Sequence, residues 1–348
     1  MLGMDAGDPV STSRSPLAQL RAHIDLFQCP RCGGALVAGA EIRCAGCGGS
    51  FPVDDGIPRL YVPNDPESEA EVLTGRIRAF YEETPFPDYE DFESIQDLVR
   101  KAERGLFARM LNDQIPFGST VLEVGCGTGQ LTNYLGVAQR FVFGADMTLN
   151  SLKLAEEFRA RNELDNVGFY QMNLYRPTFR NESFNVVLCN GVLCAVADPY
   201  RGFRSIAPLV KRGGYLLVGT YNTFGRLITD LRRAIINILG ERFAFLDPNL
   251  RDEKLGRRKK EAWFADQYRH PHESKHTFGE VLSWFSDNGF DFVYGIPSPK
   301  AFQAFHEQTS MFEPQAPGNW LDHLIVQTQL VLRGSQEGGF FVMIGRRR

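Results

Sequence analysis

Seven short runs rich in β-branched and other apolar residues alternate with helix-like segments from residue 120 onward, and they constrain the fold of this 348-residue chain. Such alternation is typical of a parallel sheet whose strands are connected by helices. The predicted strands are residues 120–124, 141–146, 167–172, 184–189, 214–220, 290–296 and 340–345. The last two are expected to form a closing, hairpin-like pair. The chain is therefore predicted to be an α/β protein with a doubly wound, seven-stranded sheet.

Composition narrows the class of protein further. Hydrophobic residues make up 43% of the chain and charged residues 23%, which is the balance of a globular protein and not of a disordered one. The net charge of -4 provides no global positive field, so nucleic acid is an unfavoured partner. No window of 18 apolar residues and no signal-peptide pattern are found, so we expect a cytoplasmic protein without a membrane partner.

Four of the seven cysteines are clustered near the start of the chain in two CxxC pairs, CPRC and CAGC, separated by eleven residues. Two such pairs can surround one tetrahedral Zn²⁺. A redox dithiol or an iron–sulfur site are the alternatives, but four thiolates close the zinc shell and leave no open position. Zinc can contribute roughly 10–16 kcal/mol to so small a module. The predicted zinc ligands are Cys29, Cys32, Cys44 and Cys47.

Changes in composition divide the chain into four parts. Residues 1–26 are expected to be a flexible tail, since residues 1 to about 16 show no apolar periodicity. The Cys- and Gly-rich module covers 27–62 and is followed by the polar linker PNDPESEAE. Residues 72–118 are predicted to form a helical lead-in, or gate, before the core domain at 119–348. Insertions at 222–275 and 298–337 are expected to cover a substrate.

The first predicted strand continues into a glycine-rich turn, Glu123-Val-Gly125-Cys-Gly127-Thr-Gly129. Glycines there let the backbone approach a ligand closely. Asp146 ends the second strand, 21 residues after Gly125, where a carboxylate can bind the hydroxyls of a ribose. Gly129 follows Gly127 by two residues and not by three, which disfavours the pyrophosphate of a dinucleotide.

The stretches VLEVGCGTGQLT, GADMTLNSLKLA, QMNLYRPTFRNESFNVVLCNGVL and LVKRGGYLLVG resemble the class I S-adenosylmethionine-dependent methyltransferases. The resemblance is clear over residues 120–220 and looser to the end of the chain. It implies a Rossmann-like sheet and S-adenosylmethionine as the cofactor. The module at 27–62, with its DGIPRL ending, separately resembles the small zinc ribbon related to the activator subunit of some methyltransferases.

The methyltransferase resemblance also implies roles for single residues. The three turn glycines would line the methionine and ribose, Glu123 would orient the ammonium, and Asp146 would bind the ribose hydroxyls. Met147 would pack on adenine, whose edge would be read by Asn173 and the Leu174 amide. The full set expected at the cofactor is Tyr81, Glu123, Gly125, Cys126, Gly127, Gly129, Asp146, Met147, Asn173, Leu174 and Asn190. Two residues depart from the family: Asn173 stands where Asp is usual, and Cys194 where His is frequent.

The methyl acceptor is harder to place, because holding a nucleophile in line and removing its proton can suffice for methyl transfer. The segment DQYRHPHESKH holds three histidines, His270, His272 and His276. It could be a solvated loop, a general base at the substrate, or a second metal site. Tyr221 and Asn222 follow the fifth strand, where they could bind substrate or cap the strand end. The candidate catalytic residues are His270, His272 and Tyr221.

In the lead-in, FYEETPFPDY resembles a gate, so that Tyr81 or Phe86 could close over the cofactor. The favoured function is methyl transfer to an O or N nucleophile of a small-molecule metabolite. One alternative is an RNA or translation-factor methyltransferase that uses the ribbon for recognition, and another is a non-catalytic scaffold that binds the cofactor. A homo-oligomer, or a protein partner bound through the ribbon, stays open.

Overall fold

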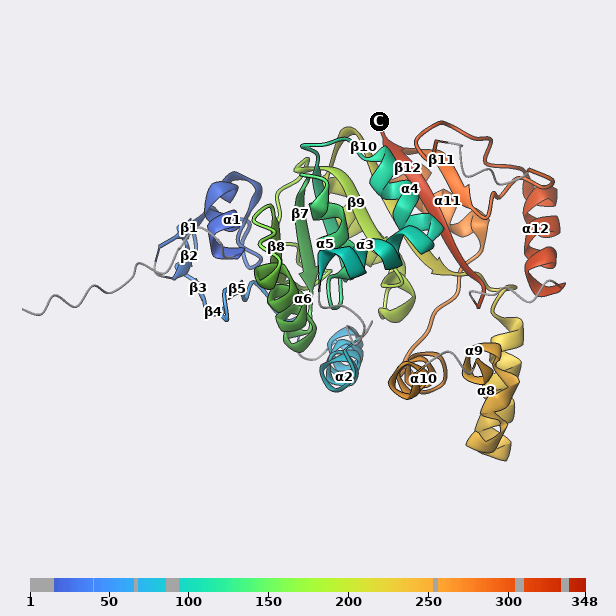
Figure 1. The fold of residues 1–348 in the computed structure, drawn as a ribbon. Coiled ribbons are helices and arrows are strands. Elements are labelled where there is room, and N and C mark those ends of the chain that lie inside the picture. Colours follow the sequence, from blue (N-terminus) through green and yellow to red (C-terminus); the bar gives the residue numbers. More distant parts are fainter. Residues whose placement is uncertain are drawn as a thin grey trace, which may run out of the picture.

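The computed structural model describes residues 16–39, 41–65, 68–85, 94–252, 256–303, 310–332 and 338–348 (Figure 1). Its centre is a seven-stranded sheet in the order β11-β12-β10-β9-β6-β7-β8. The strands are β6 (Thr120–Val124), β7 (Phe141–Asp146), β8 (Val167–Gln171), β9 (Phe184–Asn190), β10 (Val210–Tyr221), β11 (Phe290–Ile296) and β12 (Phe340–Arg347). Six begin where the sequence predicts, and β10 begins four residues earlier, before an irregularity between Val210 and Tyr215. The predicted α/β class is confirmed.

The direction of the strands sets the position of the site. The strands β8, β7, β6, β9 and β10 run parallel, while β12 is antiparallel to both β10 and β11, as predicted for the closing pair. The chain proceeds outward through β6, β7 and β8 and then returns to β9 on the other side of β6. Ligands of open α/β sheets bind at the carboxyl ends of the strands beside such a reversal of order.

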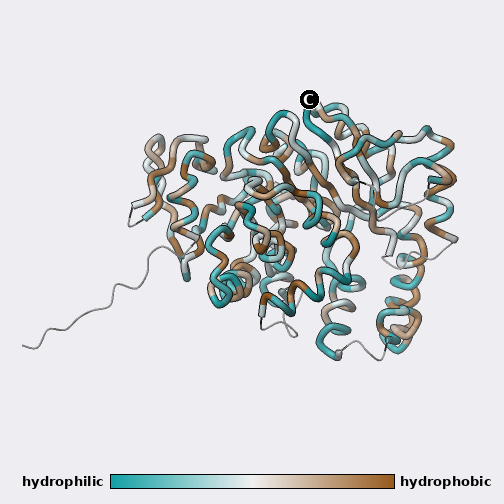
Figure 2. The backbone as a smooth tube through the Cα atoms, turned by 45° about the horizontal axis from the view of Figure 1, so that its top comes forward, coloured by the Kyte–Doolittle hydropathy of each residue, from teal (hydrophilic) through white to brown (hydrophobic). Residues whose placement is uncertain are grey.

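Both faces of the sheet are covered because its strands are apolar on both sides. In β6, Val121 packs into one buried cluster with the helices α3 to α6, whereas Leu122 packs into the other with α7 and α11. Figure 2 shows hydrophobic (brown) stretches through the middle of the chain and also in its outer helices. These helices are α3 (Ile95–Arg104), α4 (Leu106–Gln114), α5 (Gln130–Val137), α6 (Leu149–Arg161), α7 (Pro199–Ile206) and α11 (Phe278–Asp287).

The N-terminal module packs against the β8 edge of the sheet, at the blue end of the ribbon in Figure 1. Short bridges join the module to the domain, Phe27 with Phe179 and Arg59 with Gln171. The module covers an edge strand that would otherwise expose unpaired backbone groups. It contains β1 (Leu36–Ala38), β2 (Ile42–Cys44), β3 (Ser50–Phe51), β4 (Val53–Asp54) and β5 (Ile57–Pro58).

The flexible tail expected over residues 1–26 does not extend to residues 16–26, which form α1 (Pro16–Ala22) and a 3₁₀ turn, η1 (Ile24–Leu26). The reason is tertiary. Leu20 is fully buried, and the Gln19 amide donates to the carbonyls of Val142 and Asn166 at 3.2 and 2.9 Å. The Tyr170 hydroxyl donates to Gln19 Oε1 at 2.6 Å. Residues 1–15 lie outside the described part of the chain.

The helix α2 (Glu69–Glu83), at the start of the lead-in, and the first insertion lie at the carboxyl end of the parallel strands (Figure 1). The remaining helices of the lead-in, α3 and α4, cover one face of the sheet. The insertion forms α8 (Leu227–Leu239), η4 (Glu241–Leu246), α9 (Pro248–Arg251), α10 (Arg257–Phe264) and a π-helical turn, η5 (Ala265–Arg269). The second insertion contains α12 (Trp320–Leu332). No helix in the described ranges is long and apolar enough to span a membrane.

Candidate functional site

A cavity of about 580 Å³ lies between the carboxyl ends of β6, β7, β9 and β10 on one side and α2 with the first insertion on the other. Every residue that the sequence assigned to the cofactor lines it, except Gly129. The candidate catalytic residues His270, His272 and Tyr221 line it as well. No described residue of the second insertion does, so only the first of the two expected substrate covers contributes to this cavity.

The glycine-rich turn follows β6 and leads into α5. Gly125, Gly127 and Gly129 all have positive φ, at 71°, 52° and 72°. A Cβ at Gly125 would lie 2.1 Å from Val192 Cγ2, and one at Gly129 would lie 2.6 Å from the Phe169 ring. Glycine is therefore required both by the backbone and by the packing. Gly129 acts from behind the cavity wall, where it lets α5 approach the sheet.

Asp146 ends β7 with its carboxylate held in place by three donors. Oδ2 accepts from the Gly127 amide at 2.9 Å, and Oδ1 accepts from the Thr148 amide and hydroxyl at 2.8 and 2.7 Å. Burial raises the pKa of Asp146, and these hydrogen bonds oppose that shift. A carboxylate offers about four acceptor positions. Asp146 thus keeps capacity to accept a hydroxyl from a ligand.

Glu123 lies inside β6 beneath the turn, with only 7% of its surface exposed. Its carboxylate accepts a hydrogen bond from the Thr132 hydroxyl on α5. Burial outweighs this bond and raises the pKa of Glu123 to about 7. A carboxyl with this pKa changes charge near neutral pH, so its ionisation depends on what fills the cavity beside it.

Asn173 connects the cavity to the end of the N-terminal module. Its Nδ2 donates to the Val62 carbonyl at 2.8 Å and to Asn64 Oδ1 at 3.1 Å, and its Oδ1 accepts from the Tyr175 amide at 3.0 Å. Asn64 is fixed in turn by two bonds to Glu71 Oε2 on α2, both 2.9 Å. Both side-chain hydrogens of Asn173 are committed, so only its oxygen could still accept a bond from adenine.

The three histidines of the segment DQYRHPHESKH lie in two different environments, the cavity and the core. His270 and His272 line the cavity, and the Nε2 atoms of both are buried without a hydrogen-bond partner. His270 Nδ1 accepts from the His272 amide at 3.2 Å, so the neutral ring carries its hydrogen on Nε2. Burial lowers the pKa of His270, which favours this neutral form. His276 instead bonds Glu280 and Ser274 and packs on Trp284, away from the cavity.

Tyr221 and Asn222 separate in the same way. Tyr221 faces the cavity, and its hydroxyl accepts from Gln267 Nε2 at 3.2 Å. Burial raises the pKa of Tyr221. Asn222 is fully buried and accepts from the amides of residues 224 and 225, so it caps the strand end.

The wall behind Tyr221 is a buried ionic network that sequence reasoning missed. The Arg226 guanidinium lies 3.9 Å from the centre of the Tyr221 ring. Its Nε donates to Glu273 Oε1 at 3.0 Å, and Arg233 donates to Glu273 Oε2 at 3.1 Å. Arg226 also donates to Gln267 Oε1 at 2.7 Å. The network positions Tyr221. Of its charged residues, only Glu273 lies in the segment DQYRHPHESKH, which the sequence analysis singled out for its histidines.

Tyr81, on the last turn of α2, closes the cavity from the lead-in side. Its hydroxyl donates to Asp266 Oδ1 at 3.1 Å, and its ring lies 5.5 Å from that of His270. Burial raises the pKa of Tyr81 well above its ordinary value, so the phenol stays protonated. Phe86, the other gate residue expected, lies outside the described residues.

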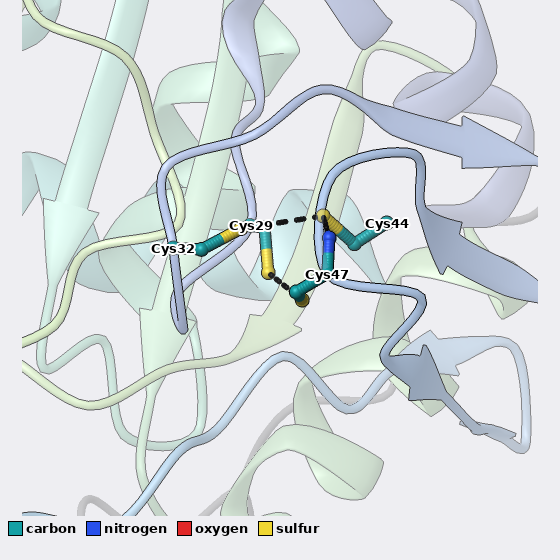
Figure 3. A group of neighbouring side chains, drawn as sticks. All are labelled: Cys29, Cys32, Cys44 and Cys47. Carbon is teal, nitrogen blue, oxygen red and sulfur yellow. Dashed lines mark hydrogen bonds between the residues drawn. The ribbon is translucent and has the colours of Figure 1, made fainter.

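The four clustered cysteines come together at one end of the module (Figure 3). Their sulfur atoms all lie within 4.8 Å of one another, with Cys29 to Cys47 at 3.8 Å and Cys32 to Cys44 at 3.5 Å. Tetrahedral zinc with Zn–S bonds of about 2.3 Å requires sulfur separations of about 3.8 Å. Backbone amides of residues 31, 34, 46 and 47 also donate to these sulfurs. The donor set fits one zinc ion.

Comparison with known proteins identifies the domain around the cavity. Residues 117–250 match the family model described as a methyltransferase domain. This part of the chain is a methyltransferase domain. Together with the seven-stranded sheet, the match confirms the predicted class I methyltransferase fold.

The similar proteins match only in part. An uncharacterised protein of Synechococcus sp. is 30% identical over 200 residues, covering 50% of this chain and 47% of that protein. A ubiquinone biosynthesis O-methyltransferase of Haemophilus ducreyi is 34% identical over 111 residues, or 30% and 47% of the two chains. The chain thus spans about half the length of these curated relatives. The structure of PKMT2 from Rickettsia typhi in complex with AdoHcy has a TM-score of 0.48 and 13% identity, covering 76% of this chain and 55% of that one.

The raised pKa of Glu123 predicts a measurable effect of pH on stability. The unfolded carboxyl ionises near its ordinary pKa of 4.5 and the folded one near 7, so the free energy of unfolding should fall as pH rises between these values. The fall should reach about 3 kcal/mol. In Glu123→Gln, thermal melts of the ligand-free protein should show a flatter pH dependence. Glu157→Gln, at an exposed position, is the control, and an unchanged profile in Glu123→Gln would contradict the assignment.

The hydrogen bonds of Asn173 predict that Asp, the residue usual in the family at this position, would destabilise this protein. In Asn173→Asp, a carboxylate would face the Val62 carbonyl and Asn64 Oδ1 without a hydrogen to donate. The free energy of unfolding should fall by about 2–4 kcal/mol, as measured by denaturant titration. Asn319→Asp is the matched control, because the described bonds of Asn319 use only its oxygen. Equal stability of Asn173→Asp and the wild type would contradict a stabilising role for the two hydrogen bonds that Asn173 donates.

Proposed function

We propose that the chain transfers the methyl group of S-adenosylmethionine to an O or N nucleophile of a small molecule. One observation carries the proposal: the glycine-rich turn, Asp146, the two unpartnered imidazole nitrogens and Tyr221 all line one cavity. When bound, the cofactor supplies a methyl group already activated on a sulfonium. The chain then needs to orient an acceptor, exclude water and remove a proton.

Each part of the cavity has a task in this proposal. The backbone of Gly125 and Gly127 lies against the methionine and ribose, and Asp146 accepts a ribose hydroxyl. His270 Nε2 donates a hydrogen bond to the acceptor, since its tautomer places the hydrogen there. His272 is then the better base of the two, because no described bond fixes a hydrogen on its buried Nε2. Tyr221 orients the acceptor from β10.

Small molecules are favoured as acceptors over RNA by the arrangement of the chain. The zinc-ribbon-like module packs against β8, while Tyr221 and the histidine segment lie beyond β9, on the other side of the cavity. α2 and η5 close over the cavity through the bond between Tyr81 and Asp266. A ribbon that recognised RNA would hold the RNA at the β8 edge of the sheet, which is farther from Tyr221 and the histidine segment. The relatives named as ubiquinone biosynthesis O-methyltransferases agree with a small acceptor.

The cofactor proposal is tested by binding. Asp146→Ala and Asp146→Asn should weaken S-adenosylhomocysteine at least about tenfold in calorimetric titration, because the ribose loses a charge-assisted acceptor. Asp165→Ala removes an exposed carboxylate near β8 and should leave the affinity unchanged. Affinities of both Asp146 variants equal to that of the wild type would refute the placement. A cofactor-binding protein that transfers no methyl to any metabolite would support the scaffold alternative.

We also propose that Cys29, Cys32, Cys44 and Cys47 hold one structural zinc ion. Elemental analysis of the purified protein should give about one zinc per chain, and Cys29→Ser with Cys44→Ser should lose it. The double variant should also melt at a lower temperature, since the metal stabilises a module with little core of its own. Cys189→Ser, buried in β9, changes a cysteine outside the cluster and should retain zinc. Zinc-free wild-type protein would contradict the proposal.

A further inference from the structure

Gln267 links the buried guanidinium of Arg226 to the hydroxyl of Tyr221. It lies in η5 with 3% of its surface exposed, and the Arg226 side chain beside it is fully buried. Arg226 Nη1 donates to Gln267 Oε1 at 2.7 Å. At the other end of the same amide, Nε2 donates to Tyr221 Oη at 3.2 Å and to Asp266 Oδ2 at 2.8 Å.

These partners allow only one orientation of the Gln267 amide. A guanidinium donates hydrogens and accepts none, so Arg226 must face the amide oxygen. A carboxylate accepts hydrogens and donates none, so Asp266 must face the amide nitrogen. Turning the amide over would bring two donors together at Arg226 and two acceptors together at Asp266, which is costly for buried polar groups. Gln267 Nε2 is thus fixed as the donor to Tyr221.

The direction of this hydrogen bond decides what Tyr221 can offer to a ligand. A phenolic hydroxyl donates one hydrogen and can also accept one. Because the oxygen accepts from Gln267, its hydrogen must point away from the amide, and no described group accepts it. The ring lines the cavity and is held by Arg226, 3.9 Å from its centre, and by Phe340, at 5.4 Å. The hydroxyl therefore presents a hydrogen, and not a lone pair, to the cavity.

We propose that Tyr221 donates this hydrogen to an oxygen of the methyl acceptor, and that Gln267 and Arg226 are positioning residues that fix the hydroxyl as a donor. The inference rests on the proposed function and restricts the acceptor to small molecules that carry a carbonyl or hydroxyl oxygen. The hydrogen on His270 Nε2, in the same cavity, favours the same kind of group. An ammonium group at Tyr221 would instead face the hydroxyl with a second donor. Tyr221 then selects the acceptor and does not act as its base.

Acetophenone and α-methylstyrene are matched probes, since they have nearly the same shape and a CH₂ group in the second replaces the carbonyl oxygen of the first. Ligand-observed NMR titrations in the presence of S-adenosylhomocysteine give the two affinities, and their ratio is the preference for the carbonyl. Tyr221→Phe should lower this preference about three- to tenfold, because one hydrogen bond is lost. Tyr215→Phe, on β10 but outside the cavity, should retain it.

Gln267→Glu tests the positioning role. A carboxylate at this position still accepts from Arg226, but it also accepts the Tyr221 hydrogen and so turns it from the cavity. The preference should fall as far as in Tyr221→Phe, and combining the two substitutions should lower it no further. A further loss in the double variant would mean that Gln267→Glu only disturbs the packing, and would contradict the positioning role. Gln303→Glu, at an exposed position, is the control.

An unchanged preference in Tyr221→Phe would overturn the inference, as would failure of the wild type to bind acetophenone. Should Gln267→Glu not fold, Gln267→Met replaces it. Nothing then fixes the hydroxyl hydrogen, so the preference should fall by less than in Tyr221→Phe, and a wild-type preference would contradict the role of Gln267. Failure to bind S-adenosylhomocysteine would contradict the proposed function instead, and titrations of the ligand-free protein would still test Tyr221.

Discussion

The carboxylate of Asp146 joins the two strand-to-helix turns on which the cavity depends. Its position at the end of β7 is fixed by the sheet, and its two oxygens bind the amide of Gly127 in the first turn and Thr148 in the second. The positive φ angles of the first turn direct that amide toward the carboxylate. This carboxylate therefore fixes the shape of the cavity at these two turns before any ligand binds, which lowers the entropic cost of binding.

The N-terminal module stabilises this part of the cavity from the β8 edge of the sheet. Aromatic rings of Phe27, Phe143, Tyr170 and Phe179 pack together where the module meets β7 and β8. From the same side, Val62 and Asn64 hold the Asn173 side chain directly after β8. The module is thus bonded to the loop that forms one end of the cavity, and its folding bears on the shape of that end.

The sequence predicted what depends on local pattern. Strand positions followed from short apolar runs, and the turn followed from glycine spacing with Asp146 at the end of the next strand. The four cysteines were brought together as their spacing indicated. The helix at residues 16–22 was missed because it depends on tertiary contacts with the sheet, which Gln19 and Leu20 make, and not on a local pattern. Contacts across long sequence separations, such as Tyr81 with Asp266 or Asn173 with Asn64, left no local signal.

The central claim is that one cavity holds the cofactor with its reactive end toward the histidine segment. A crystal structure of the protein with S-adenosylhomocysteine tests it most directly. The claim predicts the ribose hydroxyls at the Asp146 carboxylate and the sulfur atom facing the space between His270, His272 and Tyr221. A ligand bound with its ribose away from Asp146, or with its sulfur turned from these three side chains, would contradict it.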